Sequence, residues 1–90
     1  APVLSISRDG NLYLDQKLVG ITKKITKKPA VLMNKLNTIK RDWAKSHTTP
    51  FPGEINLQAD KEVSSTTVST VMGMLTSGQY QSIQLAVIGQ

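Results

Sequence analysis

Hydrophobic and polar residues alternate along three short stretches near the start and in the middle of the chain. A period of two places one set of side chains on one face, so these stretches are expected to be half-buried β-strands. The predicted inward positions are Leu4 and Ile6, then Leu12 and Leu14, then Ile55, Leu57 and Ala59. Asp9-Gly10 suits a tight turn with positive φ angles, which predicts a hairpin of the first two strands. Leu18 and Val19 are expected to close the second strand or to pack just beyond it.

Two other segments repeat hydrophobic residues at helical spacing, which predicts one buried stripe on each helix. The stripe positions are Leu32, Leu36, Ile39 and Trp43 after Pro29, then Val68, Val71, Met72 and Leu75. Ser64 is the expected N-cap of the second helix, and Val63 and Val68 form a hydrophobic staple. Gly78 is expected to supply its left-handed stop.

Alternation returns at the end of the chain, where Ile83, Leu85 and Val87 predict a last strand. A strand, helix, strand order of this length favours a right-handed crossover between two parallel strands. Residues 46–53 carry two prolines and a glycine and are expected to be a loop in which Phe51 packs locally. We therefore predict one α+β domain over residues 1–90, with two helices on one face of a small mixed sheet in the order β-β-α-β-α-β.

Charge divides the chain into two unlike halves. Residues 1–45 hold ten Lys or Arg against three Asp, a net charge of +7, whereas residues 46–90 have a net charge of −2. From Val63 onward there is no charged side chain. The two halves are therefore expected to meet different partners. Without cysteine the chain can form no disulfide and no thiolate metal site. With no long apolar run and no signal-peptide pattern at its start, the chain as given is expected to be soluble. Because it opens directly into an apolar strand with no methionine, it is expected to be a piece excised from a larger protein.

The sequence Ile-Thr-Lys-Lys occurs twice in residues 21–28, which places four lysines within six residues: Lys23, Lys24, Lys27 and Lys28. Like charges at this spacing repel in a helix, so the segment is predicted to be either a helix start or an irregular arm. Two interpretations stay open: an electrostatic arm that binds an anionic polymer, or a solvated charged face.

Chemistry that would indicate an enzyme is missing from the sequence. His47 is the sole histidine, and no second histidine or cysteine accompanies it as a metal ligand. Asp60 and Glu62 are expected to favour the positive end of the following helix rather than to serve as acid and base. The glycines are scattered and form no phosphate-binding loop. We expect no catalysis, no metal and no cofactor. The alternative function is a small basic nucleic-acid-binding module, although few aromatic residues could stack on bases.

Two parts of the chain carry a resemblance to a known family. The residues Ala59-Asp60-Lys61-Glu62-Val63, followed by a helix and a strand at 83–87, resemble a turn motif of the ExbD/TolR family. Residues 5–19, Ser-Ile-Ser-Arg-Asp-Gly-Asn-Leu-Tyr-Leu-Asp-Gln-Lys-Leu-Val, are similar to the opening hairpin of that family. Residues 20–53 are less typical of the family, because the repeated Ile-Thr-Lys-Lys and the Pro-Phe-Pro-Gly loop look like insertions.

The resemblance implies a periplasmic domain of an inner-membrane motor driven by the proton-motive force. Such a domain acts as a homodimer beside an ExbB/TolQ-like membrane partner and engages peptidoglycan or a TonB/TolA-like protein that spans the periplasm. The proton-carrying aspartate of the family lies in a transmembrane helix that this chain does not contain, so no aspartate here inherits that role. Ile83, Leu85, Val87 and Ile88 are the predicted strand-pairing residues, because an uncharged terminal strand invites pairing between copies.

Overall fold

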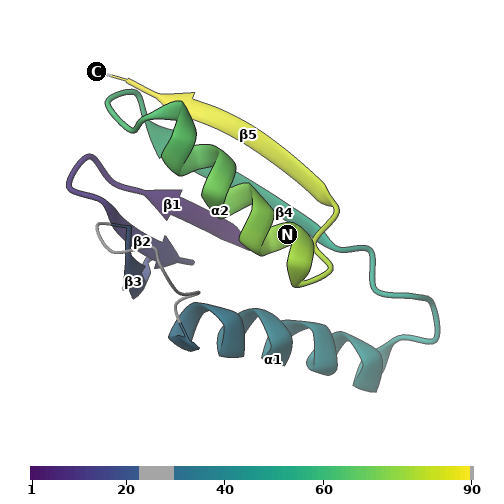
Figure 1. Cartoon of the computed structure of the whole chain (residues 1–90). Coiled ribbons are helices and arrows are strands. Elements are labelled where there is room, and N and C mark those ends of the chain that lie inside the picture. The colour runs from purple at the N-terminus through teal and green to yellow at the C-terminus, as the bar shows by residue number, and fades with distance from the viewer. Residues whose placement is uncertain (23–29, 90) are drawn as a thin grey trace.

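The structure, a computed structural model, describes residues 1–22 and 30–89. Seven elements follow in the order β1 (Val3–Ile6), β2 (Asn11–Leu14), β3 (Lys17–Ile21), α1 (Ala30–Ser46), β4 (Glu54–Asp60), α2 (Ser65–Ser77) and β5 (Ser82–Ile88). The strands form one sheet in the order β3-β2-β1-β4-β5. Both helices lie against one side of this sheet (Figure 1). The predicted α+β class, with two helices and a mixed sheet, is confirmed.

Strand pairing matches the predicted hairpin and the predicted crossover. β1 and β2 are antiparallel, whereas β4 is parallel both to β1 and to β5. Leu4, Leu57 and Leu85 lie side by side in register across β1, β4 and β5. Because paired residues point to the same face, alternate positions of each strand face the helices, as the alternation predicts.

The structure has one strand more than the predicted order β-β-α-β-α-β, so the predicted topology is corrected. Residues 17–21, expected to extend β2 or pack beyond it, form the separate strand β3, antiparallel to β2. Asp15 and Gln16 have φ angles of 49° and 72°, so a two-residue loop with positive φ reverses the chain. Leu18 pairs with Tyr13 and Gly20 with Leu12, which leaves Val19 as the extra residue of a bulge. The bulge interrupts the alternation that would have marked this strand.

The hydrophobic core lies between the sheet and the two helices. Its buried residues are Leu4, Ile6, Leu12, Leu14, Val19, Leu32, Leu36, Ile55, Leu57, Ala59, Val71, Leu75 and Tyr80. All the inward positions predicted for the strands that became β1, β2 and β4 are among these buried residues. On α1, Leu32 and Leu36 are buried, whereas Ile39 and Trp43 are half-buried. Met74, which the predicted stripe of α2 does not include, is also buried.

The two ends of α2 differ in how well the sequence predicts them. Ser64 is the N-cap, and its hydroxyl accepts a hydrogen bond from the Thr67 backbone N–H at 3.1 Å, as expected. At the other end Gly78 has a φ of −86°, and Gln79 takes the left-handed conformation with a φ of 70°. The Tyr80 N–H donates to the Leu75 carbonyl at 2.9 Å, the hydrogen bond of a Schellman motif. The prediction that Gly78 supplies the left-handed residue is therefore wrong by one position.

The loop before β4 passes close to the end of α2. Gly53 has a φ of +66°, and a Cβ built there would lie 2.6 Å from the Gln79 carbonyl oxygen. Only glycine satisfies both conditions at once. In the same loop, the Phe51 ring meets the Tyr80 ring edge-on with centroids 5.3 Å apart. Phe51 therefore packs against a core residue that lies far along the chain.

Candidate functional site

Strand β5 forms one edge of the sheet and is the main candidate for binding. Within the described residues it pairs with β4 alone, so its outer backbone groups face away from the sheet. Leu85 and Val87 are 47% and 66% exposed, and Ile88 is 43% exposed. Leu85 and Val87 are in register with Leu57 and Ala59, which are buried under the helices. The helices thus cover β4 but leave an apolar margin along β5.

The turn that carries the family resemblance connects three elements. The Asp60 carboxylate accepts a hydrogen bond from the Glu62 N–H at 2.9 Å and pairs with the Arg8 guanidinium at 3.7 Å. The Lys61 N–H donates to the Ile88 carbonyl at 2.8 Å. Asp60 therefore shapes the turn and links it to the β1–β2 hairpin, while the first turn of α2 contains no acidic residue. The expectation that Asp60 and Glu62 also favour the positive end of α2 stays a prediction.

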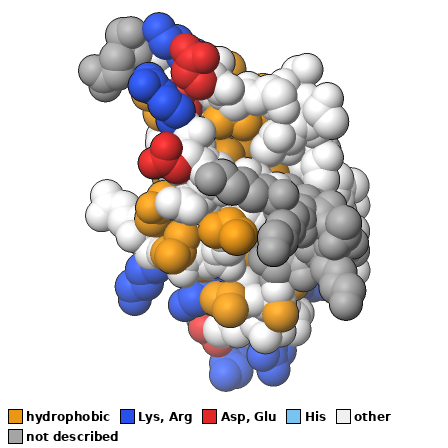
Figure 2. All heavy atoms as spheres, turned by 60° about the vertical axis from the view of Figure 1, so that its left-hand side comes forward, with side chains coloured by type: hydrophobic (Ala, Val, Ile, Leu, Met, Phe, Trp, Pro, Cys, Tyr) orange, Lys and Arg blue, Asp and Glu red, His pale blue; other side chains and the backbone are white. Residues whose placement is uncertain are grey.

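Charged side chains gather where this turn meets the hairpin. In the view of Figure 2, acidic and basic side chains adjoin at the upper left of the molecule, and hydrophobic side chains lie below them. The exposed hydrophobic residues of this side of the sheet and of α1 include Leu18, Ile21 and Val31. A binding partner could therefore contact two kinds of side chain here: the ion-paired charged residues and the scattered apolar residues.

The face of the sheet opposite the helices is almost free of charge. Strand register places these residues on it: Val3, Ser5, Asn11, Tyr13, Leu18, Ile21, Asn56, Gln58, Ser82, Gln84, Ala86 and Ile88, with Glu54 and Asp60 at the ends of β4. None of them is Lys or Arg, whereas α1 carries Lys35, Lys40, Arg41 and Lys45. The basic residues of α1 thus lie on the helix side of the sheet, and the opposite face, built from both halves of the sequence, carries no Lys or Arg among these residues.

The predicted lysine arm lies outside the described residues, since Lys23, Lys24, Lys27 and Lys28 are not among residues 1–22 and 30–89. Its first residue, Ile21, is the last residue of β3 and is 51% exposed. The repeat is therefore not helical at Ile21, and whether its lysines form a helix or an irregular arm stays a prediction.

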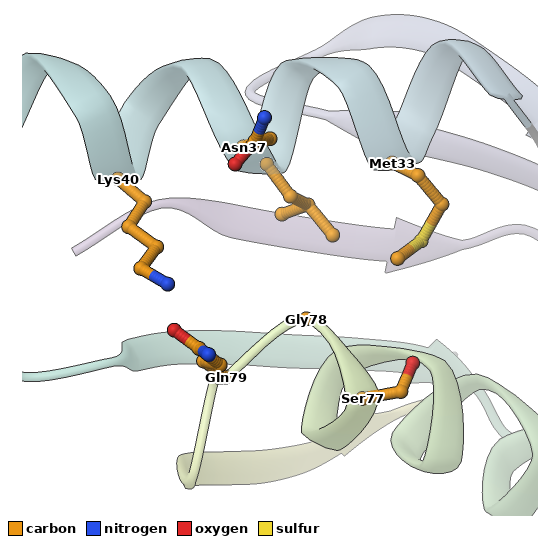
Figure 3. A pocket seen from close by; sticks show the side chains of 7 residues that line it. Met33, Asn37, Lys40, Ser77, Gly78 and Gln79 are labelled. Carbon is orange, nitrogen blue, oxygen red and sulfur yellow. The ribbon is translucent and has the colours of Figure 1, made fainter.

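A cavity of about 250 Å³ lies between α1 and the end of α2. In Figure 3, Met33 and Lys40 extend from α1 towards the turn that holds Gly78 and Gln79. Its polar groups are amides, one hydroxyl and one ammonium, and it contains no carboxylate or histidine. These groups do not form a nucleophile with a base beside it.

His47 has a structural setting just beyond the end of α1. Its imidazole stacks on the Trp43 indole at 3.5 Å with an interplanar angle of 3°. Its Nδ1 lies 2.9 Å from the Ser46 hydroxyl and 3.1 Å from the Trp43 carbonyl. Among the described residues, no three His, Asp or Glu side chains group closely enough to hold a metal ion.

No known protein family matches this chain, and no curated protein matches it either. Within residues 1–22 and 30–89, no helix has the length and the apolar character that crossing a membrane requires. The surfaces described above are therefore the basis for a function.

Proposed function

We propose that this chain is a non-catalytic coupling and binding domain of the ExbD/TolR type, located in the periplasm. In this proposal it belongs to an inner-membrane motor driven by the proton-motive force. The resemblance supports the proposal because its residues fall in two coherent units, the β1–β2 hairpin with β3 and the β4–turn–α2–β5 unit. A transmembrane helix outside these 90 residues would join the domain to an ExbB/TolQ-like partner.

The observation that carries this proposal is the uncharged edge strand β5. Edge strands in soluble proteins usually hold a charged residue, a proline or a bulge that prevents pairing with another chain. β5 has none of these, and Leu85, Val87 and Ile88 are exposed along it. An added strand would satisfy the outer backbone groups and cover these side chains. A second copy of the chain would supply that strand in a homodimer, and an extended segment of a TonB/TolA-like protein would supply it during coupling.

Charge segregation supports a second contact, with an anionic polymer of the periplasm. The lysines of the arm at 23–28 follow β3 directly, and α1 adds four more basic residues. In this proposal the basic side of the domain is held to peptidoglycan, while the uncharged edge β5 stays available for a strand.

Light scattering over a concentration series tests the role of β5. We expect the native domain to associate as its concentration rises. The substitution Val87→Lys should weaken this association at least ~10-fold, because a dimer paired through β5 would bury two new charges. Since Val87 is 66% exposed, the variant should fold as well as the native chain.

Ser69→Lys is the matched control, because it adds the same charge at an exposed position of α2. It should associate like the native domain. A native chain that stays monomeric at every concentration, or equal association of both lysine variants, would rule out strand pairing through β5.

A further inference from the structure

A second cavity, of about 380 Å³, lies where α1, the loop before β4 and the start of β1 meet. It is lined by Ala1, Pro2, Asp15, Ile39, Trp43, Phe51, Pro52 and Glu54. Most of this lining is aromatic or aliphatic. Its two ionisable side chains are both acidic, and its one cationic group is the α-amino group of Ala1. No Lys or Arg lines the cavity, although the protein as a whole has a formal charge of +5.

Packing around the cavity fixes its aromatic wall. His47 covers one face of the Trp43 indole but does not line the cavity, so the cavity meets the indole from another side. The Trp43 Nε1–H donates to the Thr49 carbonyl at 3.2 Å, which sets the orientation of the ring. Phe51 stands edge-on to Trp43, with centroids 6.2 Å apart. Phe51 is itself held by Tyr80, which is fully buried.

The acidic wall is also ordered. The Asp15 N–H donates to the Val3 carbonyl at 2.9 Å, and Asp15 Oδ1 accepts from the Val3 N–H at 3.0 Å. These two bonds hold the turn against β1 and fix the Asp15 side chain at the wall of the cavity. Glu54 is exposed at the first position of β4. Among the described residues, neither carboxylate forms an ion pair, since the ion pairs there are Arg8–Asp60 and Asp42–Lys45.

We propose that this cavity is a binding site for a lysine or arginine side chain of a protein partner. An aliphatic stem would pack on Ile39 and Pro52. The ammonium or guanidinium group would lie near the ring faces, where the aromatic quadrupole attracts a cation, and within reach of the two carboxylates. Charge complementarity favours this occupant, because the two carboxylates outnumber the single amino group of Ala1, so that an added cation balances the charge of the cavity whereas an anion would increase it. This site does not depend on the proposed function, since its contacts involve neither β5 nor the lysine arm.

The test uses the indole resonance of Trp43, the sole tryptophan of the chain. Acetyl-Gly-Lys-Gly-amide and its arginine analogue are titrated into the domain, and the Nε1–H signal of Trp43 is followed by NMR. Acetyl-Gly-norleucine-Gly-amide, which keeps the stem without the charge, is titrated in parallel. We expect a saturable shift with both cationic peptides and binding by the norleucine peptide that is weaker by about tenfold, from one cation–π contact and two ion pairs.

Substitutions of the two carboxylates test whether they bind the cation, and a substitution outside the cavity serves as the control. Glu54→Gln should weaken binding of the lysine peptide about threefold, and the double variant with Asp15→Asn should weaken it about tenfold. Asparagine keeps the acceptor for the Val3 N–H and tolerates the positive φ of residue 15. Asp42→Asn, an exposed acidic position on α1 outside the cavity, should bind like the native chain.

Several results would overturn the proposal. Equal binding of the lysine and norleucine peptides would mean a merely apolar cavity, and equal binding by the double variant would mean that the carboxylates are not involved. A signal that does not saturate would mean that there is no site. If the double variant fails to fold, Glu54→Gln alone decides, because its exposed side chain forms no ion pair among the described residues.

Discussion

Tyr80 connects the two helices at the level of a single side chain. It follows the left-handed Gln79 at the end of α2, and its ring is fully buried. Its hydroxyl donates to the Leu36 carbonyl of α1 at 2.7 Å, and its ring supports Phe51. Burial raises the pKa of the Tyr80 hydroxyl to about 12 from the usual 10.0. The neutral phenol is thus part of the folded state.

Replacing this phenol gives a prediction with a definite dependence on pH. In Tyr80→Phe, the lost hydrogen bond should lower the free energy of unfolding by about 1 kcal/mol at neutral pH. Because the pKa of Tyr80 is higher in the folded state, its stabilising effect is complete below pH 10 and is lost as pH rises towards 12. The rise of the Tyr80 pKa from 10.0 to about 12 corresponds to a loss of about 2 to 3 kcal/mol in the free energy of unfolding once the pH exceeds both values.

Urea unfolding of both proteins between pH 8 and about pH 11.5 checks this. The native chain should be the more stable at pH 8, and the difference should shrink and then reverse. A difference that stays constant over this range would show that Tyr80 is not shielded from water.

Two leucines at matched positions test the inward face of the sheet. Leu57 is fully buried, whereas its register partner Leu85 on β5 is 47% exposed. Leu57→Ala should cost about 2 to 5 kcal/mol of unfolding free energy, because a cavity would remain in the core. Leu85→Ala should cost less than about 1 kcal/mol at concentrations where the chain is monomeric. Urea melts of the two variants decide, and equal losses would mean that the assigned faces are wrong.

At the level of elements, the sequence predicts best where one regular pattern decides the structure. The strands with strict alternation and the cap at Ser64 agree with the prediction, because burial of one face and capping of free N–H groups are local requirements. β3 is missed because Asp15-Gln16 lacks the glycine typical of a two-residue turn and because the bulge at Val19 breaks the alternation. The end of α2 is shifted by one residue because Gln79 adopts the conformation usually given to glycine.

The candidate sites could be predicted only in part, for the same physical reasons. An uncharged last strand is visible in the sequence, but its exposure depends on its place at the sheet edge, which is a tertiary property. The cavity beside Trp43 joins residues that are far apart in the chain, from Ala1 to Glu54. No local spacing signals such a site. The lysine arm lies outside the described residues and stays a prediction.

At the scale of the whole molecule, the described residues separate the basic helix α1 from a sheet face that carries no Lys or Arg. The basic side comprises α1, with Lys35, Lys40, Arg41 and Lys45. The opposite face of the sheet carries no Lys or Arg among these strand residues, and β5 forms an open edge of the sheet. Such a division suits a coupling domain, because one side can hold an anionic polymer while the other receives a strand. It also distinguishes this function from that of a nucleic-acid-binding module, which would need its basic side alone.

Whether the lysine arm holds the domain to an anionic polymer can be measured by cosedimentation with purified peptidoglycan, at low and high salt and with duplex DNA as competitor. We predict that the native domain sediments at low salt, that raised salt releases it, and that DNA displaces it weakly. At physiological salt the Debye length is about 8 Å, so the lysines act only near contact. A folded variant with glutamate at Lys23, Lys24, Lys27 and Lys28 should remain in solution. Equal sedimentation of the two proteins, or a native domain that leaves peptidoglycan for DNA with a steep salt dependence, would contradict the account.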